Sequence, residues 1–252
     1  MHGKLGTPVA KSSSAARPGR AAIAALLGSA LLAAGGCNPV TRPPAARLPA
    51  AATPASGAPE SELVRAIDAK RSEIRILVYR GGALGFLGHN HVLIARGLSG
   101  EVHERADGHG GRFELTIPVA ALAVDEPAAR REAGADFASD PSGADIAGTR
   151  QNLLGPEQLD AAAFAVIRAS GRTSAATGGV VEAQIELHGR AVPLTVPVTV
   201  VREGSSLIAS GELPLSQLAL GLTPYSVLGG ALQVRDQLQL RFRIVAVSRG
   251  GS

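Results

Sequence analysis

Apolar and polar residues alternate one by one along several segments of this sequence, and this feature limits the fold more than any other. The alternating segments are Glu73 to Val78, Arg112 to Val119, Val181 to His188, Val192 to Val200 and Gln237 to Ile244. A period of two places every second side chain on the same face of a strand, so one face is buried and the other is wet. We therefore predict that residues 61–252 form one mainly β domain.

The alternation is interrupted between Glu126 and Ala163. Helical spacing of Ile146, Leu153 and Leu154 predicts a short helix that ends near Gly155. We also predict a second short helix from Pro156 to about Ala162, and a long exposed loop from Pro127 to Gly143.

Two prolines mark one of the strands as unusual. Pro193 and Pro197 lie within the Val192 to Val200 segment and cannot donate ladder hydrogen bonds, so this strand is predicted at an edge or at bulges. Alternating strands separated by turn residues can form a sandwich or an up-and-down barrel. The pattern alone does not choose between these two architectures.

Residues 1–36 have the features of a secretory signal. The chain has 25 Lys and Arg against 21 Asp and Glu, and the excess of four is supplied by Lys4, Lys11, Arg17 and Arg20. Because the remainder is neutral, a nucleic-acid partner is not predicted. The apolar run that follows, 21–34, is shorter than the roughly 20 residues that span a bilayer, so it is typical of a signal peptide.

Cys37 is the only cysteine in the chain and follows the apolar run directly. The stretch Leu32 to Cys37 resembles a bacterial lipobox, although Ala34 stands where leucine is usual. The resemblance implies a lipidated Cys37 at the new N-terminus. Cleavage at another small residue is the alternative. With Asn38 next, and in a Gram-negative host, the resemblance favours a lipoprotein of the outer membrane that faces the periplasm.

Residues 37–60 are predicted to be a tether between the anchor and the domain. Six prolines occur between Asn38 and Pro59, with Ala, Thr and Ser as most of the rest and no apolar period. A polyproline II chain extends by about 3.1 Å per residue, so this segment can hold a domain away from a membrane.

His89 and His91 are the most distinctive polar pair of the sequence. On a strand, residues two apart lie on one face, so the two imidazoles could share a zinc, copper or iron ion. Two ligands do not complete a site, and His103, His188 and Asp236 are the candidates for the remainder. The alternative roles are contact with a ligand headgroup and a purely structural one.

The sequence has no motif that predicts catalysis. The glycines between Gly81 and Gly88 lack the GxGxxG or GKS/GKT pattern and are typical of turns, and GxSxG, HExxH and CxxC are absent. Asp125 and Glu126 are adjacent carboxylates in a predicted loop, where we expect both to be solvated. A non-enzymatic function is therefore predicted.

Several segments, in order, resemble the YceI-like family of secreted lipid-binding proteins. The matching segments are Ala66 to Ile74, Leu98 to Val102, Arg150 to Ile167, Leu187 to Leu194 and Val234 to Leu240. Two positions depart from the pattern: Leu98 replaces an aromatic residue and Ala165 replaces a proline. The resemblance implies an antiparallel, lipocalin-like barrel of about eight strands with a short helical insertion.

The same resemblance implies an apolar bore that holds an amphipathic chain such as a polyisoprenoid, with no required cofactor and with homodimers as one option. A barrel of about eight strands has room for packed side chains or one slender ligand. The candidate bore residues are Phe86, Leu93, Phe113, Leu115, Ile117, Phe164, Ile185, Leu238 and Leu240. Two alternatives stay open: a metal-binding protein or metalloenzyme using His89 and His91, and an interaction lipoprotein whose barrel is filled solid.

Overall fold

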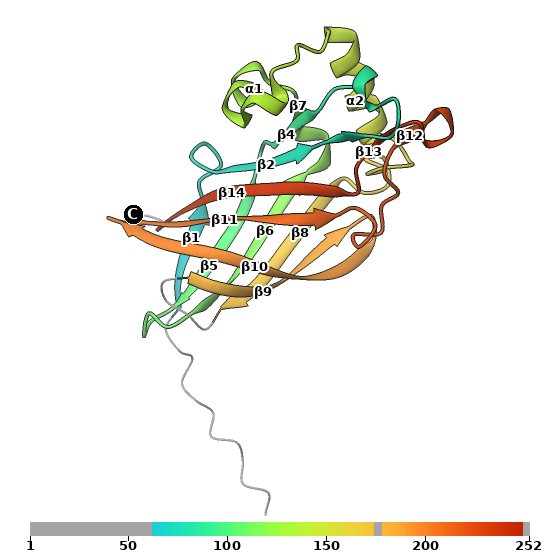
Figure 1. The fold of residues 1–252 in the computed structure, drawn as a ribbon. Helices are drawn as coiled ribbons and strands as arrows, with labels where there is room; N and C mark the ends of the chain where they lie inside the picture. The colour runs from blue at the N-terminus through green and yellow to red at the C-terminus, as the bar shows by residue number, and fades with distance from the viewer. Residues whose placement is uncertain (1–61, 174–177, 249–252) are drawn as a thin grey trace, which may run out of the picture. The chain divides into compact units, whose positions relative to one another are not determined.

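The computed structural model describes residues 62–173 and 178–248, which form an antiparallel β-barrel (Figure 1). Cys37, the signal segment and the tether lie outside the described residues. Around the closed ring, the eight strands are β1 (Glu62–Ile67), β5 (Ser99–Arg105), β6 (Gly111–Pro118), β8 (Val166–Thr173), β9 (Gly178–Leu187), β10 (Arg190–Glu203), β11 (Ser206–Ser216) and β14 (Gln237–Ser248). Pairing of β14 with β1 closes the ring. The mainly β class and the barrel predicted from the sequence are confirmed.

Strand β14 is long enough to serve two neighbours on the same side. Its last residues, Ala246 to Ser248, pair with β1, while Gln239 to Arg243 pair with β2 (Glu73–Val78). Two further strands continue from β2, namely β4 (His91–Ala95) and β7 (Leu122–Val124). A separate small sheet consists of β12 (Ser226–Val227), β13 (Leu232–Val234) and β3 (Arg80–Gly81). The pairing partner of β14 on this side therefore changes along its length, from β1 at one end to β2 at the other.

The main core lies inside the barrel, as the alternating pattern predicts. Its buried residues include Ile74, Leu115, Ile117, Leu187, Leu213 and Leu215. Two inward phenylalanines lie over glycines of neighbouring strands: a Cβ on Gly171 would lie 2.6 Å from Phe113, and one on Gly211 would lie 2.8 Å from Phe242. Glycine at these two positions lets an aromatic ring lie close to the wall, a known device in curved sheets.

The prediction for the proline-containing strand was wrong in one respect. β10 is an interior strand of the ring and pairs with β9 from Arg190 to Thr199. Its ladder with β11, however, covers only Thr199 to Glu203. Pro193 and Pro197 both lie before this ladder begins, in the half of β10 that pairs with β9 only. A residue without an N–H donor can be accommodated there.

Two α-helices lie in the segment between β7 and β8. They are α1 (Pro127–Ala133) and α2 (Gly143–Leu154), and the short 3-10 turns of the chain are η1 (Gly85–Leu87), η2 (Val119–Ala121), η3 (Ala135–Phe137) and η4 (Leu228–Gly230). A capping box starts α2, since Ser142 Oγ accepts from the Asp145 amide at 3.2 Å and the Asp145 carboxylate accepts from the Ser142 amide at 2.9 Å. The predicted helix that ends near Gly155 is thereby confirmed.

The other two predictions for this segment were wrong. Residues 127–143 are not one exposed loop, because Pro127 starts α1 and Phe137 is 2% exposed. Phe137 packs with Leu77, Val92 and Ile94 on the outer face of β2 and β4, which buries that face under α1. Residues 156–162 form turns and no helix. None of the helices in the described residues is long and apolar enough to cross a bilayer.

Candidate functional site

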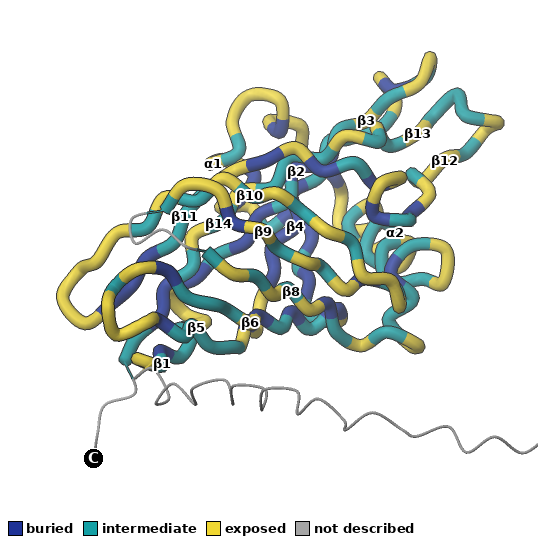
Figure 2. Tube along the Cα trace, turned by 90° about the horizontal axis from the view of Figure 1, so that it is seen from below, coloured by how far each residue is buried: buried dark blue, intermediate teal, exposed yellow. Residues whose placement is uncertain are grey.

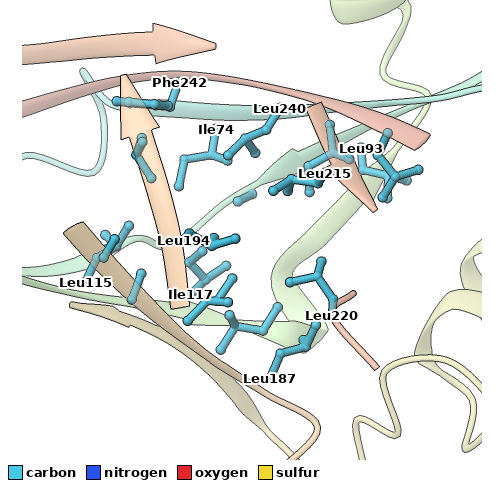
Figure 3. Close-up of a pocket in the computed structure, with 18 of the residues that line it drawn as sticks. Ile74, Leu93, Leu115, Ile117, Leu187, Leu194, Leu215, Leu220, Leu240 and Phe242 are labelled. Atoms are coloured by element: carbon cyan, nitrogen blue, oxygen red, sulfur yellow. The ribbon is translucent and has the colours of Figure 1, made fainter. Parts of the chain in front are cut away.

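The inward side chains of the barrel enclose a cavity of about 480 Å³. Most of its wall consists of aliphatic and phenylalanine side chains that converge from several strands, as Figure 3 shows for Leu93, Leu194 and Phe242. Of the predicted bore residues, seven line this cavity: Leu93, Phe113, Leu115, Ile117, Ile185, Leu238 and Leu240. The cavity has the size and apolar character of a site for a small hydrophobic molecule.

Two predicted bore residues lie elsewhere. Phe86 is 70% exposed on η1 and is not part of the cavity wall. Phe164 lies outside the cavity against the β9–β10 turn, where its ring meets that of His188 edge to face with centroids 4.8 Å apart. Both phenylalanines belong to connections, whose side-chain direction a strand period does not determine.

One end of the cavity is crossed by a cluster of three charged residues, Arg65, Glu104 and Arg202, which we call the charged end. Arg65 Nε donates to Glu104 Oε2 at 3.0 Å, and Arg202 forms an ion pair with Glu104 Oε1. Arg65 also donates to Ser205 O and, at 2.9 Å, to Ser248 Oγ. Both oxygens of the Glu104 carboxylate are thus engaged by arginine side chains.

The opposite end of the cavity carries His91, and we call it the histidine end. His91 Nδ1 lies 2.6 Å from Asp125 Oδ2, and the Asp125 side chain is completely buried. The other Asp125 oxygen accepts from the Val92 amide at 2.9 Å and from Arg130 Nη1 at 2.5 Å. Burial alone would raise the pKa of Asp125, but the hydrogen bonds from His91, Val92 and Arg130 and the charge of His91 hold this pKa below its usual value.

The bond to Asp125 decides what His91 can offer to a ligand. Because an ionised carboxylate only accepts hydrogen bonds, the proton of a neutral His91 lies on Nδ1 and Nε2 is the free acceptor. In residues 62–173 and 178–248, no hydrogen bond to His91 Nε2 is found. His91 therefore presents one oriented polar atom at the end of an apolar cavity.

Arg130, on α1, holds Asp125 and the surrounding loops in this arrangement. Its guanidinium donates to the carbonyls of Asn90, Phe137 and Ser139 at 2.7 to 2.9 Å, in addition to Asp125. Asp125 itself has a φ of 55°, a left-handed value that is uncommon outside glycine and asparagine-like residues. The sequence prediction of a solvated Asp125 was wrong, since the residue is 2% exposed.

The structure does not bring the two histidines to a common partner. His89 precedes β4, and its Nδ1 lies 3.3 Å from Ser139 Oγ, while its ring and that of His91 are 6.4 Å apart between centroids. The other candidates lie apart: His103 contacts Glu62 and Glu101, His188 packs on Phe164, and Asp236 bonds Ser216 and the Leu218 amide. Within the described part of the chain, no three His, Cys, Asp or Glu side chains form a group suited to a metal ion.

A family model for the YceI-like domain matches residues 66–246. The chain belongs to the YceI-like family. The match begins within β1 and ends within β14, so it covers the other six strands of the ring in full and these two in part. Comparison with curated proteins gave no match.

Two solved structures share this YceI-like fold. The crystal structure of BcnA from Burkholderia cenocepacia is 17% identical with a TM-score of 0.52, and the match covers 72% of this chain and 99% of BcnA. A polyisoprenoid binding domain from Saccharophagus degradans, implicated in plant cell wall breakdown, is 13% identical with a TM-score of 0.51, over 74% of this chain and 99% of that domain. At these identities the likeness establishes the fold.

Proposed function

We propose that this protein binds one long-chain isoprenoid lipid in its barrel and carries it without chemical turnover. The observation that carries the proposal is the cavity of about 480 Å³ with its aliphatic wall. Each methylene that leaves water for such a wall contributes about 0.8 kcal/mol, so a long chain needs few polar contacts. The likeness in fold to the polyisoprenoid binding domain from Saccharophagus degradans supports this ligand class.

The ligand has one direction in the proposed complex. Glu104 at the charged end is already bonded through both carboxylate oxygens, whereas His91, which lines the cavity at the histidine end, has no hydrogen bond at Nε2 from the described residues. The polar headgroup therefore lies at His91 and the apolar tail extends towards the charged end. A neutral His91 accepts a hydrogen bond from a headgroup hydroxyl, and a protonated His91, paired with Asp125, donates to a carbonyl or phosphate oxygen.

The proposed setting is a bacterial cell envelope. The signal-like residues 1–36, the lipobox-like stretch before Cys37 and the proline-rich residues 38–59 support a lipoprotein that holds its barrel in the periplasm, with the outer membrane as the proposed site of anchoring. A carrier in this position would work between membranes or between a membrane and a soluble acceptor.

Native mass spectrometry, followed by organic extraction, tests whether the barrel holds a lipid. The protein is purified from its own host as wild type, as Ile185→Trp and as the matched control Val180→Trp. Both residues lie on β9, but Ile185 lines the cavity while Val180 is 60% exposed. We expect one extractable isoprenoid per chain in the wild type and in Val180→Trp.

The Ile185→Trp variant should lose the lipid but remain folded, since overpacking costs about 1 to 3 kcal/mol. Circular dichroism checks that the barrel is intact. Full lipid occupancy in Ile185→Trp would place the ligand outside the cavity, and a wild-type barrel with no bound lipid would contradict the carrier function.

A further inference from the structure

Three large apolar side chains project into solvent close to the histidine end of the barrel. Phe86, Leu87 and Leu228 are 70%, 61% and 69% exposed, and we call them the apolar tip. They lie on two loops that are far apart in sequence, η1 after β3 and η4 between β12 and β13. Figure 1 shows the β12–β13 loop projecting beyond the barrel wall, and Figure 2 shows exposed residues along this region.

Hydrogen bonds join the two loops, so the fold fixes the position of the apolar tip. The Leu84 amide donates to the Ala231 carbonyl at 2.7 Å, and β3 pairs with β13. Gly82 has a φ of 83°, and a Cβ at this position would lie 2.4 Å from the Ala231 oxygen, so the close approach of the loops requires glycine. The Arg80 guanidinium, on β3, donates to the Gly88 carbonyl at 2.5 Å and so joins the strand before η1 to the residue after it.

The apolar tip is continuous with the cavity. Gly88 and Leu232, which end the two tip loops, line the cavity together with Tyr225 and Gln233. A Cβ on Gly88 would lie 3.1 Å from Leu232 Cδ1, so the two loops meet at the cavity wall. An apolar molecule that leaves the cavity at the histidine end therefore passes directly to the exposed side chains of the tip.

The two chain segments that form the tip carry charge of one sign. Residues 79–91 and 217–235 contain Arg80 and Arg235 and no Asp or Glu, and both arginines are exposed. Arg235 lies beside Gly81 of β3, since a Cβ on Gly81 would lie 3.1 Å from Arg235 Cγ. This combination of exposed apolar side chains with flanking cations suits the boundary between anionic headgroups and acyl chains.

We propose that the apolar tip inserts into the interfacial region of a bilayer that contains anionic lipid, and that it places the cavity entrance on the membrane surface. The purpose of this docking rests on the proposed lipid cargo. The occupant is the bilayer itself, because Arg80 and Arg235 complement anionic headgroups and because the tip leads into an apolar cavity. The first described strand, β1, begins at Glu62, which pairs with Arg105 beside the charged end and not at the tip.

Tryptophan fluorescence tests the proposal on the full chain, which has no Trp of its own. Single tryptophans are introduced as Phe86→Trp and Leu228→Trp, with Val180→Trp on β9 as the exposed control away from the tip. Vesicles are made of phosphatidylcholine alone or with phosphatidylglycerol, each with and without brominated acyl chains. Anchoring by the N-terminal segment is common to all three variants, so only the position of the probe differs.

The Phe86→Trp and Leu228→Trp variants should show a blue shift and bromine quenching with phosphatidylglycerol vesicles, while Val180→Trp shows neither. Adding Arg235→Gln to Phe86→Trp should raise the phosphatidylglycerol fraction that gives half of the shift. Unchanged emission of the Phe86→Trp variant with every vesicle would overturn the proposal. A blue shift that depends on protein concentration without vesicles would overturn it in favour of a second copy of the chain. Tryptophan fluorescence reports insertion whether or not the cavity is filled. A negative fluorescence result therefore leaves the lipid-extraction test of the proposed function unaffected.

Discussion

Glu104 on β5 and Arg202 on β10 form an ion pair across the inside of the barrel, from strands that lie four places apart in the ring. Arg65, on the strand next to β5, bonds the same carboxylate at 3.0 Å. Arg65 and Glu104 are each less than 10% exposed, whereas the Arg202 side chain is 42% exposed, so the cluster is a partly buried ionic link between opposite walls.

Removing the Glu104 charge should strongly destabilise the barrel. Glu104→Gln leaves Arg65 buried without its counter-charge, and breaking a buried pair from one side typically costs about 3 to 5 kcal/mol. Urea unfolding followed by circular dichroism measures this loss. The control is Glu186→Gln. Glu186 forms an ion pair with Arg168 at 4.0 Å in which both side chains are more than half exposed, so this change should cost less than about 1 kcal/mol. Equal losses in the two variants would contradict the structural role of the cluster.

His91 should contribute more to ligand affinity than His89. A hydrogen bond that involves a charged group contributes roughly 1.5 to 3 kcal/mol, so His91→Ala should weaken lipid binding by about tenfold to a hundredfold. His89, whose partners are Ser139 and Asp145, should have a smaller effect as His89→Ala. The control is His188→Asn, outside the cavity, at a φ of 52° that asparagine tolerates. Competition with a fluorescent fatty acid measures the affinities, and an equal effect of all three changes would contradict the headgroup role.

Asp125 should make the stability of the protein depend on pH in the acid range. Its pKa in the folded state lies below the ordinary value of 3.8, so the unfolded chain binds the proton more tightly. The resulting stabilisation is fully present above the unfolded pKa and is lost as the pH falls through the folded pKa, from about pH 4 downwards.

Urea unfolding at several pH values between about 7 and 3 checks this sign. Asp125→Asn should be less stable at neutral pH and should show a shallower loss on acidification than the wild type. The exposed Asp140→Asn is the control. A slope in Asp125→Asn equal to that of the wild type would show that other carboxyl groups cause the acid sensitivity.

The strands and their inward faces could be predicted from the sequence because burial in a barrel has the same period as the strand itself. Glu104 and Arg202 also had a signal, since each continues an inward stripe: Glu104 follows Val102, and Arg202 follows Val200. A charge at an inward position of a strand indicates a buried partner on another strand. Which strand carries the partner depends on the ring order, which no local pattern contains.

Asp125 and α1 could not be found by the same reasoning. Asp125 is buried because α1 folds back and brings Arg130 to it, and because β4 places His91 alongside. The adjacent Glu126 is exposed enough to pair with Arg96 at the surface, so two neighbouring carboxylates have opposite environments. Their difference arises from tertiary contacts, and Pro127 at the first helical position was the local sign of the helix.

Lipidation of Cys37 remains a prediction, since this residue lies outside the described part of the chain. The membrane-bound protein should begin at an acylated Cys37, and Cys37→Ser should yield either an uncleaved precursor or a protein released from the membrane. Intact mass measurement of the membrane and soluble fractions separates these forms. A soluble wild-type protein that begins at another residue would contradict the prediction.

The ionic link between Arg65, Glu104 and Arg202 has a consequence for delivery. We expect the link to obstruct its end of the bore and to leave a single doorway, so that a chain that enters tail first leaves head first. The acceptor therefore meets the polar group of the cargo before any of the hydrocarbon is uncovered. The depth between the link and His91 also sets the greatest tail length that can be sheltered from water, and longer tails leave their surplus outside the doorway.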